Sequence, residues 1–259
     1  MSIHWFYYAA PQNFFRLSAR LWPWCAGLAG VLAVIGLWLG LVVAPIDAQQ
    51  GEGYRIIFVH VPASWMSMVV YLAMGFWSVM GLTFKTRLSG MMTQALAPTG
   101  AIFAALSLLT GALWGKPMWG TWWVWDARLT SELILFFLYV GFIALTSAID
   151  DVKRAERAGA LISIVGCINV PIIYFSVKWW NTLHQGASVS LTQSPSMARL
   201  MLWAMLLMAM SLWAYTLAIV FYRVRCLILQ RERESRWLKA WFEQEQMTQA
   251  HQASWVAGR

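Results

Sequence analysis

The sequence predicts an all-α integral membrane protein, built as a bundle of six transmembrane helices. Of its 259 residues, 60% are hydrophobic and only 12% are charged, whereas soluble domains average about 25% charged residues. The apolar residues lie in blocks longer than the roughly 18 residues that mark a membrane span. The six blocks cover about 21–44, 62–84, 95–114, 129–149, 159–177 and 199–222. Since backbone groups in hydrocarbon must pair within their own segment, each block is expected to be a helix.

The distribution of lysine and arginine predicts that both termini lie in the cytoplasm. Most of these residues fall in the N-terminal segment, the 85–94 and 150–158 loops and the segment after residue 222. Cytoplasmic loops of membrane proteins carry the excess of basic residues, and an even number of spans returns the chain to its starting side. The exterior loops are then expected at about 45–61, 115–128 and 178–198. The net charge of +8 is therefore attributed to topology, and no nucleic-acid partner is predicted.

The chain is expected to form one membrane domain over residues 1–245, followed by a polar tail over 246–259. The first apolar block is longer than the core of a signal peptide, and no convincing cleavage site follows it, so we expect it to be retained. A stripe of apolar residues at helical spacing follows the last span: Trp237, Leu238, Trp241 and Phe242. This stripe suits a membrane surface or a partner, or else a solvated tail, and both interpretations stay open.

Tryptophan is the second unusual feature of the composition, with 18 residues in the chain. Five of them gather in one predicted exterior loop over residues 114–128: Trp114, Trp119, Trp122, Trp123 and Trp125. Interfacial belts of tryptophan spread over several helix ends, so a belt does not explain this cluster. A broad aromatic surface is what a large planar porphyrin would need. Lys116, Pro117 and Gly120 are expected to break the helix and bend this segment.

Two of the four histidines are predicted to share the exterior face with the tryptophan cluster. His60 precedes Pro62, which suits the first turn of the second helix, and His184 follows the fifth span. Neutral imidazole is a common ligand of haem iron, so the pair could supply two axial nitrogens. Two interfacial histidines that only form hydrogen bonds are the alternative. His4 and His251 lie near the chain ends in no motif and are interpreted as incidental.

Four charged residues have more than one interpretation. Asp126 could hold a tryptophan N–H or pair with Arg128. Arg128 and Arg55 are candidate partners for anionic propionates, because guanidinium binds carboxylate with two hydrogen bonds, although Arg55 could equally be a plain loop charge. Glu132 lies at the edge of the membrane, where an ionisable group is often functional; capping, or a pair with Arg128 one turn away, is the simpler explanation.

The run Trp119-Gly-Thr-Trp122-Trp123-Val-Trp125-Asp126-Ala-Arg128 resembles the WWD signature of haem-handling proteins. With six spans and His60 and His184 in flanking exterior loops, the chain most closely resembles the CcmC family of the bacterial cytochrome c maturation system. This resemblance implies a protein of the bacterial inner membrane that holds haem b at the periplasmic face. It implies that the two histidines are axial ligands and that the tryptophan loop is a platform.

The same resemblance implies a set of partners and a role in delivery. Haem would pass to the periplasmic chaperone CcmE, with the ABC-type subunits CcmA and CcmB and the small subunit CcmD in the complex. No catalytic residue and no independent enzyme activity are expected. Two other classes remain as alternatives: an integral b-type cytochrome in electron transfer, and a small-solute transporter whose tryptophans form only a belt.

Overall fold

Long apolar helices make up most of the chain. The computed structural model describes residues 7–180, 182, 184, 189 and 194–257; His4 and residues 258–259 of the predicted tail lie outside them. Six helical segments in the described residues are long and apolar enough to cross a membrane: Pro11–Val43, Glu52–Phe84, Arg87–Trp119, Ala127–Ala148, Val152–Trp179 and Arg199–Arg231. The described residues contain no strand. The prediction of an all-α, six-span membrane protein is confirmed.

The described residues form eight α-helices and three short helical segments, of which η1 and α8 lie outside the six spans. The α-helices are α1 (Pro11–Trp38), α2 (Ile57–Phe84), α3 (Arg87–Trp119), α4 (Ala127–Ala148), α5 (Val152–Gly166), α6 (Asn169–Trp179), α7 (Arg199–Arg231) and α8 (Arg236–Ala257). The short segments are η1 (Tyr7–Ala9), η2 (Leu39–Val43) and η3 (Glu52–Ile56). Helices α5 and α6 together form the fifth span.

Two helix boundaries differ from the prediction in ways that matter for the site. Helix α3 continues through Pro117 and ends at Trp119, because proline is tolerated within membrane helices; only the segment from Gly120 to Asp126 is non-helical. The expectation that Lys116 and Pro117 break the helix is wrong. Helix α2 starts at Ile57, so Pro62 lies inside the helix and His60 is a helical residue.

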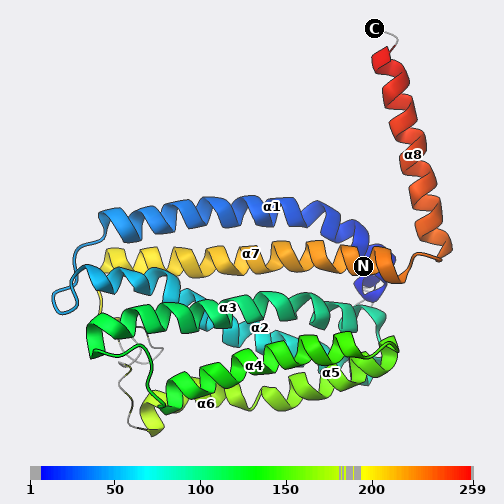
Figure 1. Cartoon of the computed structure of the whole chain (residues 1–259). Helices are drawn as coiled ribbons and strands as arrows, with labels where there is room; N and C mark the ends of the chain where they lie inside the picture. Colours follow the sequence, from blue (N-terminus) through cyan, green and yellow to red (C-terminus); the bar gives the residue numbers. More distant parts are fainter. Residues whose placement is uncertain (1–6, 181, 183, 185–188, 190–193, 258–259) are drawn as a thin grey trace.

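The helices run side by side along one axis and place the two chain ends together (Figure 1). Helix α1 packs chiefly on α7, α2 packs on α3, and α4 packs on α3, α5 and α6. Both ends of the chain, including α8, lie at one end of the bundle, and the α3–α4 connection lies at the other (Figure 1). The tryptophan-rich segment and the chain termini are therefore at opposite ends of the molecule.

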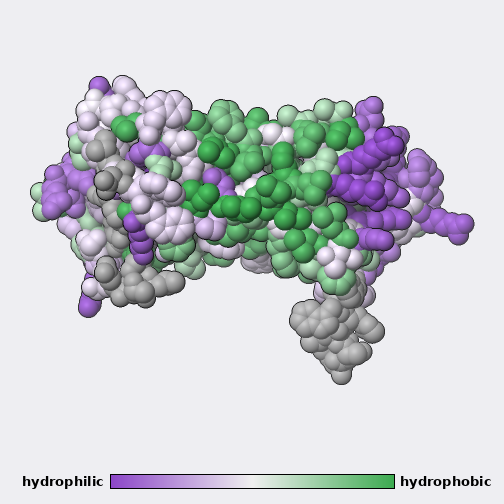
Figure 2. Space-filling view, turned by 90° about the horizontal axis from the view of Figure 1, so that it is seen from below, coloured by the Kyte–Doolittle hydropathy of each residue, from purple (hydrophilic) through white to green (hydrophobic). Residues whose placement is uncertain are grey.

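The surface has the layering expected of a membrane protein. Figure 2 shows a band of hydrophobic side chains between two more polar ends, with the most hydrophilic residues gathered at the end that carries α8. We call this the basic end, because it carries the arginine-rich end of α7 and the basic residues of the α2–α3 and α4–α5 loops. Its charge agrees with the lysine and arginine pattern of the sequence.

Two buried tyrosines join the central helices. The Tyr139 hydroxyl in α4 donates a hydrogen bond to the Ser67 carbonyl in α2 at 2.7 Å, and the Tyr71 hydroxyl donates to the Ile162 carbonyl in α5 at 3.0 Å. The two rings meet edge to face with centroids 4.9 Å apart. Polar contacts of this kind join helices where lipid supplies no hydrophobic driving force. They hold α2 and α4 in the positions from which the candidate site is built.

The apolar stripe of α8 packs against the start of α1. The Phe15 ring contacts the rings of Trp237 and Trp241, with centroids 5.9 and 5.3 Å apart, and Leu238 is fully buried. Helix α8 continues to Ala257, so most of the segment predicted as a polar tail is helical. Part of the stripe, Phe242, stays exposed.

Gly100 provides a test of the α3–α4 packing. A Cβ atom at this position would overlap the Tyr139 ring, whereas one at Gly27 of α1 would meet nothing within 4 Å. We predict that Gly100→Ala lowers the free energy of unfolding by about 1–3 kcal/mol through overpacking, while Gly27→Ala does not. Thermal unfolding of the purified protein in detergent measures both. Equal midpoints for the two variants would contradict this packing.

Candidate functional site: a pocket between two histidines

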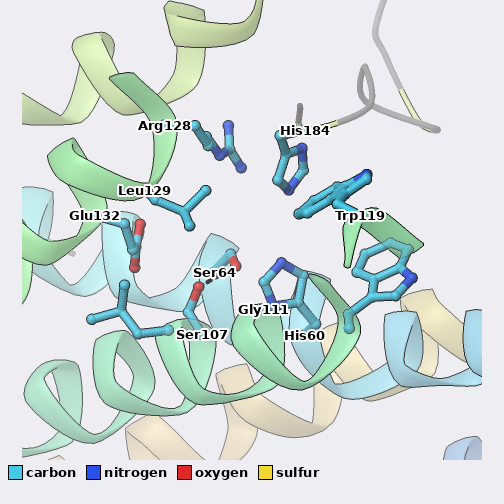
Figure 3. Close-up of a pocket in the computed structure, with 11 residues that line it drawn as sticks. His60, Ser64, Ser107, Gly111, Trp119, Arg128, Leu129, Glu132 and His184 are labelled. Atoms are coloured by element: carbon cyan, nitrogen blue, oxygen red, sulfur yellow. Dashed lines mark hydrogen bonds between the residues drawn. The ribbon is translucent and has the colours of Figure 1, made fainter. Parts of the chain in front are cut away.

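A pocket opens at the end of the bundle that carries the tryptophan-rich segment. About 450 Å³ of space that no protein atom fills lies between its walls, part of it open to solvent. Its walls come from α2, α3, α4 and the segment before α7 (Figure 3). The lining residues are His60, Ser64, Ser107, Leu108, Gly111, Trp114, Trp119, Arg128, Leu129, Glu132 and His184. Both predicted histidines therefore face one space.

His60 is held in one orientation and one tautomer by Thr110 of α3. The His60 Nδ1 lies 2.9 Å from the Thr110 Oγ1, and the Thr110 hydroxyl donates its proton to the Leu106 carbonyl at 2.6 Å. A hydroxyl has a single proton, so Thr110 must accept from the Nδ1–H of His60. The Nε2 atom then carries the free lone pair. This is the arrangement by which proteins prepare a histidine to bind a metal.

Close packing on two sides keeps the His60 ring in place. A Cβ atom on Gly111 would lie 3.2 Å from the His60 Cε1, so a larger residue here would press on the ring and α3 is closely packed against it. Trp114 packs edge to face against His60 with ring centroids 5.6 Å apart. The Trp114 Nε1 in turn donates to the Gln50 Oε1 at 2.8 Å. His60 itself is 7% exposed and has little freedom to rotate.

His184 approaches the pocket from the opposite side. Figure 3 shows the His60 and His184 rings pointing toward one another, and their centroids are 6.2 Å apart. A metal–imidazole bond is about 2 Å long, and the ring centre lies about 1 Å farther, so two imidazoles on opposite sides of one metal have centroids about 6 Å apart. The observed separation fits that arrangement.

The ligand set suits a metal that arrives with other ligands. In the described part of the chain, no group of three or more His, Cys, Asp or Glu residues could hold a metal ion. Two imidazoles alone do not complete the coordination of a bare ion such as zinc. Haem iron already has four porphyrin nitrogens and takes its remaining ligands from the protein. The residues of this pocket therefore fit a haem.

The five clustered tryptophans occupy three different environments. Trp114 is buried and packs against His60. Trp119 lines the pocket, and its ring centroid lies 6.2 Å from that of His184. Trp123 is half-buried and meets Trp125 edge to face at 5.4 Å. Trp122 and Trp125 are 54% and 76% exposed. The cluster thus contributes one support for a histidine, one pocket wall and two free aromatic surfaces.

Asp126 ends the non-helical segment and starts α4. Its Oδ1 accepts a hydrogen bond from the Leu129 amide at 2.8 Å, as an N-cap residue does. Among the described residues, no hydrogen bond joins Asp126 to a tryptophan N–H or to Arg128. The Asp126 Oδ2 and the Trp123 Nε1 are both buried without a hydrogen-bond partner there. Two polar atoms of the segment that leads into α4 thus remain unsatisfied among the described residues.

The two candidate arginines lie in different places. Arg128 lines the pocket, and its Nη1 donates to the Ile173 carbonyl of α6 at 3.0 Å. Arg55 does not line the pocket; its guanidinium forms an ion pair with Glu52 and donates to the Gly40 carbonyl at 2.6 Å. Only Arg128 is brought beside the histidines in this structure.

A buried polar row continues from His60 into the bundle. Glu132 accepts a hydrogen bond from the Ser67 hydroxyl at 2.8 Å, and the hydroxyls of Ser64 and Ser107 lie 2.5 Å apart. Sequence reasoning did not single out these serines or Thr110. The spacing of two of these serines could have indicated the network. His60, Ser64 and Ser67 recur at positions i, i+4 and i+7, which share one helix face. A polar stripe inside an apolar block indicates a buried network.

The fold and the site together define a class: a multi-span membrane protein with a paired-histidine pocket bordered by tryptophan. A family model, CcmC (heme exporter protein C), matches residues 4–239. Curated relatives named heme exporter protein C are 45% identical in Haemophilus influenzae over 233 residues and 44% identical in Escherichia coli K12 over 232 residues. They cover 90% and 89% of this chain and 95% and 93% of the relative. A relative of the same name in Bradyrhizobium diazoefficiens is 49% identical over 212 residues, which is 82% of this chain and 79% of the relative. The chain belongs to the CcmC family.

The Asp126 cap gives a local test of the pocket wall. We predict that Asp126→Ala frays the first turn of α4, at a cost of about 0.5–2 kcal/mol, while Asp126→Asn retains the cap. Hydrogen exchange of the amides in residues 127–130 should accelerate in the alanine variant alone. Asp151→Ala, which removes the equivalent cap of α5, is the matched control and should leave these amides unchanged. Unchanged exchange in Asp126→Ala would contradict this role of the cap.

Proposed function

We propose that this protein binds haem b between His60 and His184 and delivers it for cytochrome c maturation. The observation that carries the proposal is the histidine pair, with centroids 6.2 Å apart and with the Nε2 of His60 left free by the Thr110 hydrogen bond. Membership of the CcmC family supports haem as the cargo, because the relatives are named heme exporter protein C. Together, the family and the pocket favour haem export or delivery.

The pocket is proposed to open at the periplasmic face of the bacterial inner membrane. The argument is the charge distribution: lysine and arginine concentrate at the end opposite the pocket, and such residues mark the cytoplasmic side. Both chain termini then lie in the cytoplasm. Haem held in this pocket would be presented on the side where cytochromes c mature.

Arg128 is the proposed partner of a haem propionate. It lines the same pocket as the histidines, and its hydrogen bond to a carbonyl uses only part of a guanidinium that has five N–H donors. Bidentate pairing with a carboxylate would orient the haem in the pocket. Arg55 as a second propionate partner stays a prediction, since its guanidinium is paired with Glu52 in this structure.

The tryptophans are proposed to form the platform and the contact surface for delivery. Trp119 borders the histidine pair, whereas Trp122 and Trp125 expose their rings beside the pocket. Exposed aromatic residues suit a partner surface. The proposed receiver is the haem chaperone CcmE, and the proposed complex includes CcmA, CcmB and CcmD.

Delivery fits the site better than electron transfer does. In a b-type cytochrome, which keeps its haem, the ligands sit on helices within the bundle. Here His60 lies on a helix, but His184 lies outside the described helices. One fixed ligand and one ligand on a connecting segment favour a haem that can be released.

The histidine pair makes the first prediction of this function. Replacing either His60 or His184 with alanine should remove one axial nitrogen and lower haem occupancy in the purified protein. Added imidazole should restore the spectrum by filling the vacated position. His251→Ala, in α8 at the opposite end of the bundle, is the control. Transfer of haem to purified CcmE is scored separately. Wild-type spectra and wild-type transfer in both pocket variants would refute the ligand assignment.

Thr110 makes the second prediction, because it acts through His60 alone. Thr110→Val removes the acceptor for the Nδ1–H and should weaken haem binding about tenfold to a hundredfold, as loss of such a hydrogen bond does in other metal sites. Thr110→Ser keeps a hydroxyl and should rescue the affinity. The measurement is haem titration followed by absorbance. If valine and serine gave the same affinity, Thr110 would have no role in positioning His60.

A further inference from the structure

A second and larger cavity lies at the basic end of the bundle, far from the histidine pocket. It has a volume of about 1250 Å³ and is bordered by α2, α3, α4 and α5. Its lining includes apolar rings and hydroxyl or amide groups deep in the bundle and several cations near its mouth. The proposed haem function uses none of these residues, so the cavity requires its own explanation.

The mouth of the cavity carries an excess of positive charge. Of the charged residues that line it, Arg87 pairs with Glu232 at 2.9 Å, and Glu156 pairs with Arg231. Lys85, Lys153 and Arg157 also line it, and none of the three has an ion pair within the described residues. The cavity therefore offers three cations that form no ion pair with a carboxylate of the described residues.

A further feature of the cavity points to a ligand. The Ser78 hydroxyl is in its wall, and this residue is 4% exposed, yet its Oγ has no hydrogen-bond partner in the described part of the chain. Buried polar atoms are normally satisfied. Lys85 at the mouth has a positive φ of 52° because it forms the left-handed C-cap of α2, as many helix ends do.

An apolar groove continues from this cavity along the bundle. The groove has a volume of about 740 Å³ and lies between α4 and α7 over α3. It shares Gln94, Phe142 and Thr146 with the cavity, and it adds Pro98, Ile143 and Leu227 to the apolar wall. Arg223 also lines the groove, where its guanidinium donates a hydrogen bond to the Thr99 hydroxyl at 3.0 Å. Charge at one end and an apolar channel leading from it match an amphiphile with an anionic head and a hydrocarbon chain.

We propose that the basic-end cavity and the groove together bind an anionic phospholipid. The phosphate head group would lie among Lys85, Lys153 and Arg157, with a hydrogen bond to Ser78, and an acyl chain would lie in the α4–α7 groove. Basic pockets between membrane helices bind anionic head groups in this way. The proposal does not depend on the haem function, since lipid binding is measured without haem.

The test is native mass spectrometry of the purified full chain titrated with phosphatidylglycerol or with phosphatidylcholine of the same chain length. The wild-type protein should prefer phosphatidylglycerol by about tenfold or more. The triple variant Lys85→Asn, Lys153→Gln, Arg157→Gln should lose this preference; asparagine is chosen because it tolerates a positive φ. The matched control Arg16→Gln, Arg20→Gln, Arg154→Gln removes as much charge from exposed positions outside the cavity and should retain it.

A second pair of variants tests the groove. Ser147 lines the groove, whereas its exposed neighbour Ala148 lines neither space. Ser147→Trp should weaken phosphatidylglycerol binding by filling the acyl-chain position, and Ala148→Trp should not. An unchanged thermal unfolding midpoint in detergent shows that each variant is folded.

Three results would overturn the proposal. The first is an equal lipid preference in the triple variant and its control. The second is the absence of any preference in the wild-type protein. The third concerns haem, which is also an anionic amphiphile. If the His60→Ala, His184→Ala protein still bound haem, and adding the triple substitution to that protein abolished the binding, the cavity would be a haem site instead.

Discussion

The contact between α2 and α3 is the constraint on which the site depends. Along this contact the two helices exchange one histidine–threonine hydrogen bond and one serine pair, His60 with Thr110 and Ser64 with Ser107. Glycine at position 111 lets α3 pack closely against the His60 ring. Because this hydrogen bond sets the tautomer of His60, the packing of α2 on α3 determines which ring nitrogen is free to bind a metal. A shift between α2 and α3 would turn the imidazole away from the pocket before it changed the overall fold.

The tryptophan cluster is one motif in sequence but several parts in space. The continuation of α3 to Trp119 places Trp114 beneath His60 and Trp119 at the pocket wall. The bend that follows leaves Trp122 and Trp125 exposed. A motif of this kind extends from the buried His60 to the protein surface within a short stretch of chain. That is the arrangement a protein needs if it must hold a cargo and also pass it to a partner.

The sequence predicted the six spans because hydrocarbon leaves the backbone few options, and long apolar blocks satisfy them only as helices. It also predicted that His60 and His184 lie on one face of the membrane, because an even number of predicted spans separates them. It could not predict that α3 runs through Pro117, because proline stops helices in water more reliably than in a membrane; Gly120 does end the helix, as predicted. Thr110 and the buried serines were missed for a different reason: small polar residues are common in membrane helices, and only the register of α2 against α3 identifies the ones that meet.

The central claim is that both histidines bind the iron of one haem. Pulsed electron paramagnetic resonance of the ferric haem complex, prepared with ¹⁵N-labelled histidine, tests it most directly, because the electron spin of the iron couples to ligand nitrogens. This account predicts a low-spin signal with couplings to two labelled imidazoles, reduced to one coupling when either His60 or His184 is replaced. A high-spin signal, or coupling to one labelled imidazole in the unmodified protein, would contradict it.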